Sequence, residues 1–193
     1  MLAAFTLNEL TPFVFSLQPG QRHALYHGPL KSQSEHKLAD LFEAERQLPL
    51  APLTAMPDEI SVINVFSLGS AEAVERVSAS IADEPHLVAY SGIAIHEREM
   101  GEHVTKEPAL HWIDIHHSLG SKGNGINHLR KELEIDHVIA FGDGDNDLSM
   151  FECASECYAP ANADPVILEA ADEIIGHHDE DGVARFLRKR FEL

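Results

Sequence analysis

The sequence predicts an α/β protein, in which part of a parallel sheet follows a separate α+β domain. After about residue 118, strand-like and helix-like segments alternate, and this order is typical of parallel strands with right-handed crossovers. Within that half, Val138–Phe141 is a short apolar run of the kind buried in a parallel sheet. Before residue 118, short strand-like runs alternate with amphipathic helices. We therefore expect a domain at 1–117 and a second at 118–193.

The first half contains alternating strand and helix patterns. Expected strands are the two arms of a hairpin around Pro19-Gly20, and then 60–66, 86–90, 93–95 and 112–115. Two helices are expected from apolar residues at helical spacing, around Leu38 to Phe42 and Val74 to Ile81. The proline-rich segment 48–57 and the segment 101–108 are expected to be loops.

The second half contains shorter elements. Expected helices cover 126–133, begin near Leu148, run from Pro165 through Ala171, and end the chain after Val183. Asp164 precedes Pro165, a pair typical of a helix N-cap and its first residue. Expected strands are 138–141, 157–159 and 174–175.

Charge and composition exclude several classes of partner. The net charge is −18, so the chain is not expected to bind nucleic acid or an anionic membrane surface. No apolar run approaches the roughly 18 residues needed to span a bilayer, and the first residues lack the basic start of a signal peptide. The two cysteines, Cys153 and Cys157, form no disulfide framework. We therefore expect a cytoplasmic protein with reduced thiols.

An acidic turn follows the apolar run directly. Asp143, Asp145 and Asp147 lie within five residues, and carboxylates this close repel one another unless a cation compensates them. Oxygen ligands favour a hard ion such as Mg²⁺. The EF-hand alternative fails, because Leu148 and Ala154 stand where glycine and glutamate are required. A merely solvated acidic turn does not explain why the acids follow a buried strand.

A lysine lies on a second glycine-bearing turn, Gly120 to Gly125. The turn lacks the spacing of a Walker loop, and His128 occupies the third glycine position of the dinucleotide fingerprint. Lys122 therefore stands at the start of a helix, where the helix dipole disfavours a cation. A nearby anion or carboxylate would remove that conflict.

Together these stretches resemble the haloacid dehalogenase-like phosphohydrolases, specifically the Cof-type subfamily with an α/β cap. The resemblance covers about 114–193. It implies that 1–117 is the cap and that 118–193 is the C-terminal half of a Rossmann-like core. The residues that carry it are Ser121-Lys122-Gly123, Gly142-Asp143-Gly144 with Asn146-Asp147 and Met150, Asn162-Ala163, and Glu180 to Ala184.

The resemblance also implies roles for individual residues. Asp143 is expected to bind Mg²⁺ directly, and Asp147 to hold a metal-bound water or the lysine. Lys122 is expected to neutralise the phosphoryl group during catalysis, and Asn146 to contact the phosphate. Asp145 receives no role. The implied reaction is Mg²⁺-dependent hydrolysis of a small phosphorylated metabolite, such as a sugar phosphate, through an aspartyl-phosphate.

The family's N-terminal Asp-x-Asp-Gly-Thr motif, which contains the nucleophile, is not found before the expected cap. Asp179 to Gly182 matches only in part, and we interpret Asp181 as a helix N-cap. Two hypotheses follow. In the first, the protein is a phosphohydrolase, and the chain shown here has little activity by itself. In the second, the chain is an inactive relative that binds a metal, a phosphorylated ligand or a protein. The strand at 138–141 should present an open edge, so we expect a homo-oligomer formed through it. Adjacent histidines such as His177-His178 are expected to point in different directions, so we interpret them as solvated side chains and do not expect them to share a metal.

Overall fold

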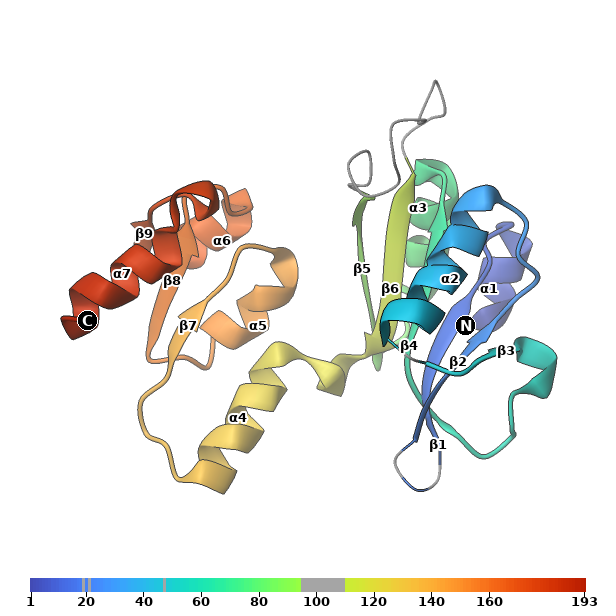
Figure 1. Cartoon of the computed structure of the whole chain (residues 1–193), viewed down its shortest axis with the longest axis horizontal. Coiled ribbons are helices and arrows are strands. Elements are labelled where there is room, and N and C mark those ends of the chain that lie inside the picture. The colour runs from blue at the N-terminus through green and yellow to red at the C-terminus, as the bar shows by residue number, and fades with distance from the viewer. Residues whose placement is uncertain (19, 21, 47, 95–109) are drawn as a thin grey trace. The chain divides into compact units, whose positions relative to one another are not determined.

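A computed structural model describes residues 1–18, 20, 22–46, 48–94 and 110–193. The chain divides into two compact units, Met1–Ser118 and Leu119–Leu193, which are described in turn (Figure 1). Among the described residues, none of the helices is long and apolar enough to cross a bilayer.

The first unit is built on a six-stranded sheet with strand order β3-β2-β1-β4-β6-β5. Neighbouring strands are antiparallel except β2 and β3, which pair in parallel. The hairpin predicted around Pro19-Gly20 is confirmed as β1 and β2. The strands are β1 (Phe13–Gln18), β2 (Arg22–His27), β3 (Leu50–Pro52), β4 (Ser61–Gly69), β5 (Leu87–Ile93) and β6 (His111–His117).

Helices pack on both faces of this sheet, because successive strand residues point to opposite sides. Val14 and Ile113 belong to one buried cluster with Phe5 of α1 (Leu2–Leu7) and Val77 of α3 (Ala71–Ile81). On the opposite face, Phe13 and Leu25 form a second buried cluster, in which Ala39 and Phe42 of α2 (Gln33–Arg46) take part.

Two predictions for this unit are wrong in detail. The segment 48–57 is not wholly a loop, because it contains β3 and a 3₁₀ turn at Leu53–Ala55. The strands predicted at 86–90 and 93–95 are one strand, β5, as far as Ile93. Gly92 does not break β5, because it and both of its neighbours pair with β6. Gly92 lies opposite Trp112, whose Nε1 is 3.0 Å from where a Cβ would be. Residue 95 and the loop predicted at 101–108 lie outside the described residues.

The second unit contains a three-stranded parallel sheet with order β7-β8-β9, which confirms the predicted α/β class. Its strands are β7 (Ile139–Phe141), β8 (Glu156–Pro160) and β9 (Glu173–Ile175). Its helices are α4 (Lys122–Leu133), α5 (Leu148–Phe151), α6 (Pro165–Ala170) and α7 (Gly182–Phe191). Within the described residues β7 pairs with β8 alone and forms one edge of this sheet. Assembly through that edge stays a prediction.

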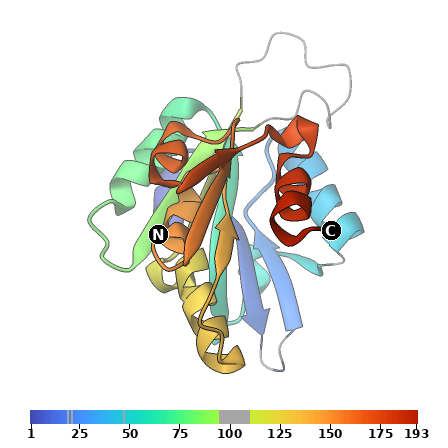
Figure 2. The same cartoon turned by 90° about the vertical axis from the view of Figure 1, so that its left-hand side faces the viewer.

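Helices cover both faces of the parallel sheet as well. Figure 2 shows α5 and α6 on one side of the strands and α7 on the other. On the first side, Ala140 and Ala159 belong to a buried cluster with Ile167 of α6. On the second side, Tyr158 packs against Phe186 of α7, with 4.2 Å between ring centroids. Alternate residues along a strand therefore pack against helices on opposite faces of the sheet.

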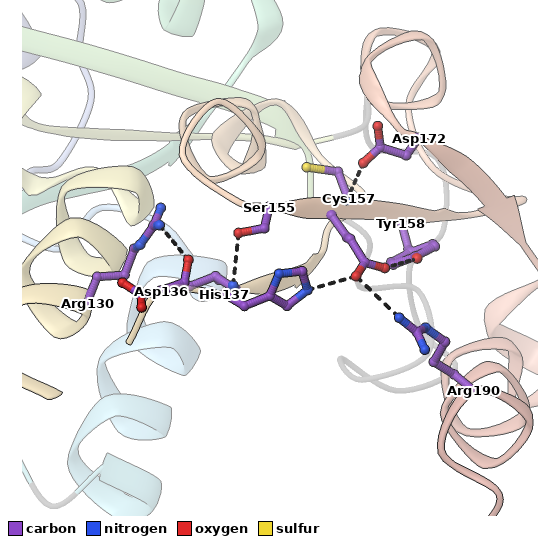
Figure 3. A network of polar contacts seen from close by, with 10 residues as sticks. Arg130, Asp136, His137, Ser155, Cys157, Tyr158, Asp172 and Arg190 are labelled. Atoms are coloured by element: carbon purple, nitrogen blue, oxygen red, sulfur yellow. Dashed lines mark hydrogen bonds and ion pairs between the residues drawn. The ribbon is translucent and has the colours of Figure 1, made fainter. Parts of the chain in front are cut away.

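A polar network joins the beginnings of β7 and β8 to α7 (Figure 3). The Glu156 carboxylate accepts hydrogen bonds from the Tyr158 hydroxyl and, at 2.7 Å, from Nε2 of His137. Arg190 of α7 lies 3.5 Å from the same carboxylate. These donors, Tyr158 first, lower the pKa of Glu156 below its ordinary value.

Candidate active site

The acidic turn is a tight connection between β7 and α5. Its last residues, Asp145–Asp147, form a 3₁₀ turn, and the N–H of Asp147 donates to the carbonyl of Gly144 at 2.8 Å. Gly142 is required for close packing, because a Cβ there would lie 2.5 Å from the Cβ of Asp147. The glycine thus lets the Asp147 side chain fold back against the end of β7.

Asp147 is the buried member of the turn, with 2% of its surface exposed. Its Oδ2 accepts backbone hydrogen bonds from Asp143 at 2.9 Å and from Gly144 at 3.3 Å. Both hydrogen bonds go to one oxygen, so the side chain closes the turn onto its own backbone. Asp147 therefore organises the backbone of the turn from within.

Lys122 reaches the other oxygen of the same carboxylate. Its Nζ lies 2.5 Å from Oδ1 of Asp147, while half of the lysine side chain stays exposed to solvent. Lys122 is the first residue of α4, whose N-cap Ser121 accepts a hydrogen bond from the N–H of Asn124. The carboxylate compensates for the unfavourable interaction of the ammonium with the positive end of the helix.

Close backbone packing sets the position of Lys122. A Cβ at Gly123 would overlap the carbonyl oxygen of Ser149 in α5, and the Gly123 N–H donates to the Ser149 hydroxyl at 3.2 Å. The first turn of α4 therefore contacts α5 directly. Sequence reasoning assigned no role to Ser149. The one local indication of a close contact was the presence of Gly123 in the first turn of a helix.

The remaining predicted residues are exposed on the turn. Asp143, Asp145 and Asn146 all face solvent. Within the described part of the chain, the Asp143 carboxylate has no hydrogen-bond or ion-pair partner, although its carbonyl accepts from the N–H of Asp164 at 2.9 Å. The structure thus brings Lys122 and Asp147 into contact. Asp143 and Asn146 lie on the same turn as Asp147, and among the described residues neither forms a hydrogen bond or ion pair with the lysine. Sequence reasoning considered Asp164 only as a helix cap, yet its side chain makes no capping bond.

The donor set of the turn fits a hard cation. Asp143 offers an exposed carboxylate, and oxygen ligands of this kind suit Mg²⁺. Asp147 fits the role of holding the lysine, because Lys122 and two backbone N–H groups already engage both of its oxygens.

Comparison with known families agrees with this geometry. Residues 11–187 match the family model of the haloacid dehalogenase-like hydrolases. The chain belongs to this family. The match includes both described units, and it confirms the resemblance deduced from the lysine turn and the acidic turn.

Individual relatives of this haloacid dehalogenase-like chain include named phosphatases. It is 34% identical over 124 residues to a phosphoglycolate phosphatase of Halorubrum lacusprofundi, covering 63% of this chain and 47% of that protein. It is 36% identical over 85 residues to the 5-amino-6-(5-phospho-D-ribitylamino)uracil phosphatase YitU of Bacillus subtilis, covering 43% and 32%. The chain spans about half the length of the first curated relatives it matches.

A solved structure shows the same fold. A haloacid dehalogenase-like hydrolase from B. subtilis superposes with a TM-score of 0.68 at 21% identity, covering 97% of this chain and 67% of that one. At this level of identity the match concerns the fold alone.

Proposed function

We propose that this chain supplies the lysine and acidic-turn half of a Mg²⁺-dependent phosphate-monoester hydrolase that acts on a small phosphorylated metabolite. The observation that carries the proposal is the contact between the Lys122 ammonium and the buried Asp147 carboxylate. Membership of a hydrolase family and similarity to a phosphoglycolate phosphatase support it. A sugar phosphate remains the expected type of substrate.

In this proposal each residue has a distinct task. Asp143, exposed at the end of β7, holds Mg²⁺. The bound ion neutralises charge on the phosphoryl oxygens. Asp147 is a positioning residue that keeps the Lys122 ammonium at the edge of the turn. The exposed half of the lysine allows its remaining N–H groups to donate to a phosphate oxygen, and Asn146 offers a further amide donor on the same turn.

The test is phosphate binding by the full chain, measured by calorimetry with and without Mg²⁺. We expect Mg²⁺ to strengthen binding of inorganic phosphate, and both Asp143→Ala and Lys122→Met to abolish that effect. The matched control is Asp145→Asn, which changes an exposed carboxylate on the same turn and should leave the effect intact. Equal Mg²⁺-dependent binding by wild type, Asp143→Ala and Lys122→Met would refute the proposal.

Hydrolysis is a separate question, because the expected nucleophile motif is absent from the sequence shown. We expect this chain alone to release little or no p-nitrophenol from p-nitrophenyl phosphate. Mg²⁺-dependent release that Asp143→Ala abolishes would show instead that the chain is active by itself.

A further inference from the structure

Three potential metal ligands gather on the turn that follows β9. Ligand atoms of His177, His178 and Asp179 all lie within 4.8 Å of one another, a grouping that occurs once among the described residues. The expectation that His177 and His178 point in different directions is wrong. Their rings stack with 4.6 Å between centroids, because His178 begins the 3₁₀ turn His178–Glu180.

The nitrogen atoms of both rings face the same carboxylate. Nε2 of His178 lies 2.9 Å from Oδ1 of Asp179, and Nδ1 of His177 lies 3.7 Å from Oδ2. The backbone N–H of Asp179 also donates to Nδ1 of His177 at 3.2 Å. Because a backbone N–H can only donate, Nδ1 of His177 accepts this hydrogen bond with its single in-plane lone pair, so a metal that binds this ring must replace that hydrogen bond or bind at Nε2.

The backbone of the turn is held from both sides. The amide oxygen of Asn162, which follows β8, accepts a hydrogen bond from the N–H of His178 at 3.0 Å. The carbonyl of His177 accepts from the N–H groups of Glu180 and Gly182, both at 3.1 Å. Because the backbone of this turn is already fixed, ligand binding costs little further conformational entropy.

The cluster is open to solvent, with side-chain exposures of 41% for His177, 61% for His178 and 75% for Asp179. An ion can therefore enter and keep water in its remaining positions. The net charge of −18 also favours cations over anions at this surface.

We propose that His177, His178 and Asp179 form a second metal site that binds a divalent transition metal of the Zn²⁺ type. Two imidazole nitrogens and one carboxylate oxygen are a common ligand set for Zn²⁺, whereas Mg²⁺ prefers oxygen ligands alone. The site lies beyond the carboxyl end of β9, and Asp143 lies beyond the carboxyl end of the parallel strand β7. It uses no residue of the acidic turn and does not depend on the proposed phosphatase function.

The experiment is a titration of the full chain with Zn²⁺ by calorimetry and with Co²⁺ by visible absorption, in excess Mg²⁺. We expect one Zn²⁺ to bind despite the Mg²⁺, and Co²⁺ to give the absorption bands of a nitrogen-containing site. Removal of a metal ligand should lower the metal affinity at least as much as removal of a residue that only hydrogen-bonds a ligand. His177→Gln and His178→Gln should therefore each weaken Zn²⁺ binding at least about tenfold.

The matched control is His128→Gln, which removes an exposed histidine of α4 outside the cluster. It should bind Zn²⁺ and Co²⁺ like the wild type. Circular dichroism tests whether each variant is folded; His178 and His128 are exposed, and His177 is partly exposed. Unchanged Zn²⁺ affinity in the folded double variant His177→Gln/His178→Gln, or no binding by the wild type, would overturn the proposal.

Discussion

Replacement of Asp147 by asparagine should destabilise the second unit strongly, because every contact of this carboxylate is with a donor. Oδ1 faces the Lys122 ammonium, and Oδ2 faces two backbone N–H groups. An amide has only one acceptor oxygen. Whichever way the new side-chain amide is oriented, its NH₂ group meets a donor, and at least one of these three donors loses its partner.

The magnitude follows from the burial of the two partners. Breaking a fully buried ion pair costs about 3–5 kcal/mol, and a hydrogen bond to a charged group contributes about 1.5–3 kcal/mol. Lys122 is half exposed, so water can solvate its ammonium in the variant. The range for a hydrogen bond to a charged group therefore applies better than the range for a fully buried ion pair. We expect Asp147→Asn to lower the free energy of unfolding of this unit by about 2–3 kcal/mol.

Hydrogen exchange measured by mass spectrometry can assign that loss to the correct unit. At about 1.4 kcal/mol per tenfold, exchange of the amides in β7 and β8 should accelerate roughly 30- to 150-fold. The strands of the first unit serve as an internal reference. Asp145→Asn, on the same turn but exposed, should leave exchange unchanged. If Asp147→Asn and Asp145→Asn exchange at the same rate, the buried carboxylate does not organise the turn.

Two further perturbations test the packing and the electrostatics of the second unit. Gly182→Ala would place a Cβ on the Gly176 carbonyl oxygen and should lower the free energy of unfolding, measured in urea, by about 1–3 kcal/mol. Gly125→Ala, with open space around it in α4, should raise that free energy by about 0.5–1 kcal/mol. Equal effects of the two substitutions would contradict the close contact between Gly182 and Gly176. The pKa of Glu156 is lowered by its hydrogen bonds to Tyr158 and His137, so its contribution to stability is present above the unfolded-state pKa, roughly 4.3, and is lost as pH falls through the lower folded value. The difference in melting temperature between wild type and Glu156→Gln should therefore be full near neutral pH and shrink in acid, and a difference that stays constant down to the acid limit would be the contrary result.

Much of the fold could be predicted because local patterns and tertiary packing agree. The apolar run of β7 followed by glycines and acids is one such case, and the apolar spacing of α3 is another. The strand β3 could not be predicted, since it is a three-residue edge strand ending in Pro52 whose support comes from pairing with β2. Continuation of β5 through Gly92 is stabilised by pairing with β6, where Gly92 lies opposite Trp112, 20 positions further along the sequence. Local propensity does not report such contacts.

The candidate site shows the same division. The motifs identified Lys122 and Asp147 as residue types at a characteristic spacing, but they did not predict which oxygen each donor engages. That distribution depends on how α4 packs on α5 and on the close approach of Gly142 to Asp147. The stacked pair His177-His178 was misjudged for a related reason: alternation applies to a strand, and these residues enter a 3₁₀ turn.

The packing of Gly123 against Ser149 has a consequence for the neighbouring residue 122. Because main-chain contact fixes where α4 starts, residue 122 keeps its place whatever side chain it carries. Exchange of the side chain at this position should therefore leave the start of α4 in place, although it deprives the buried Asp147 carboxylate of its lysine partner.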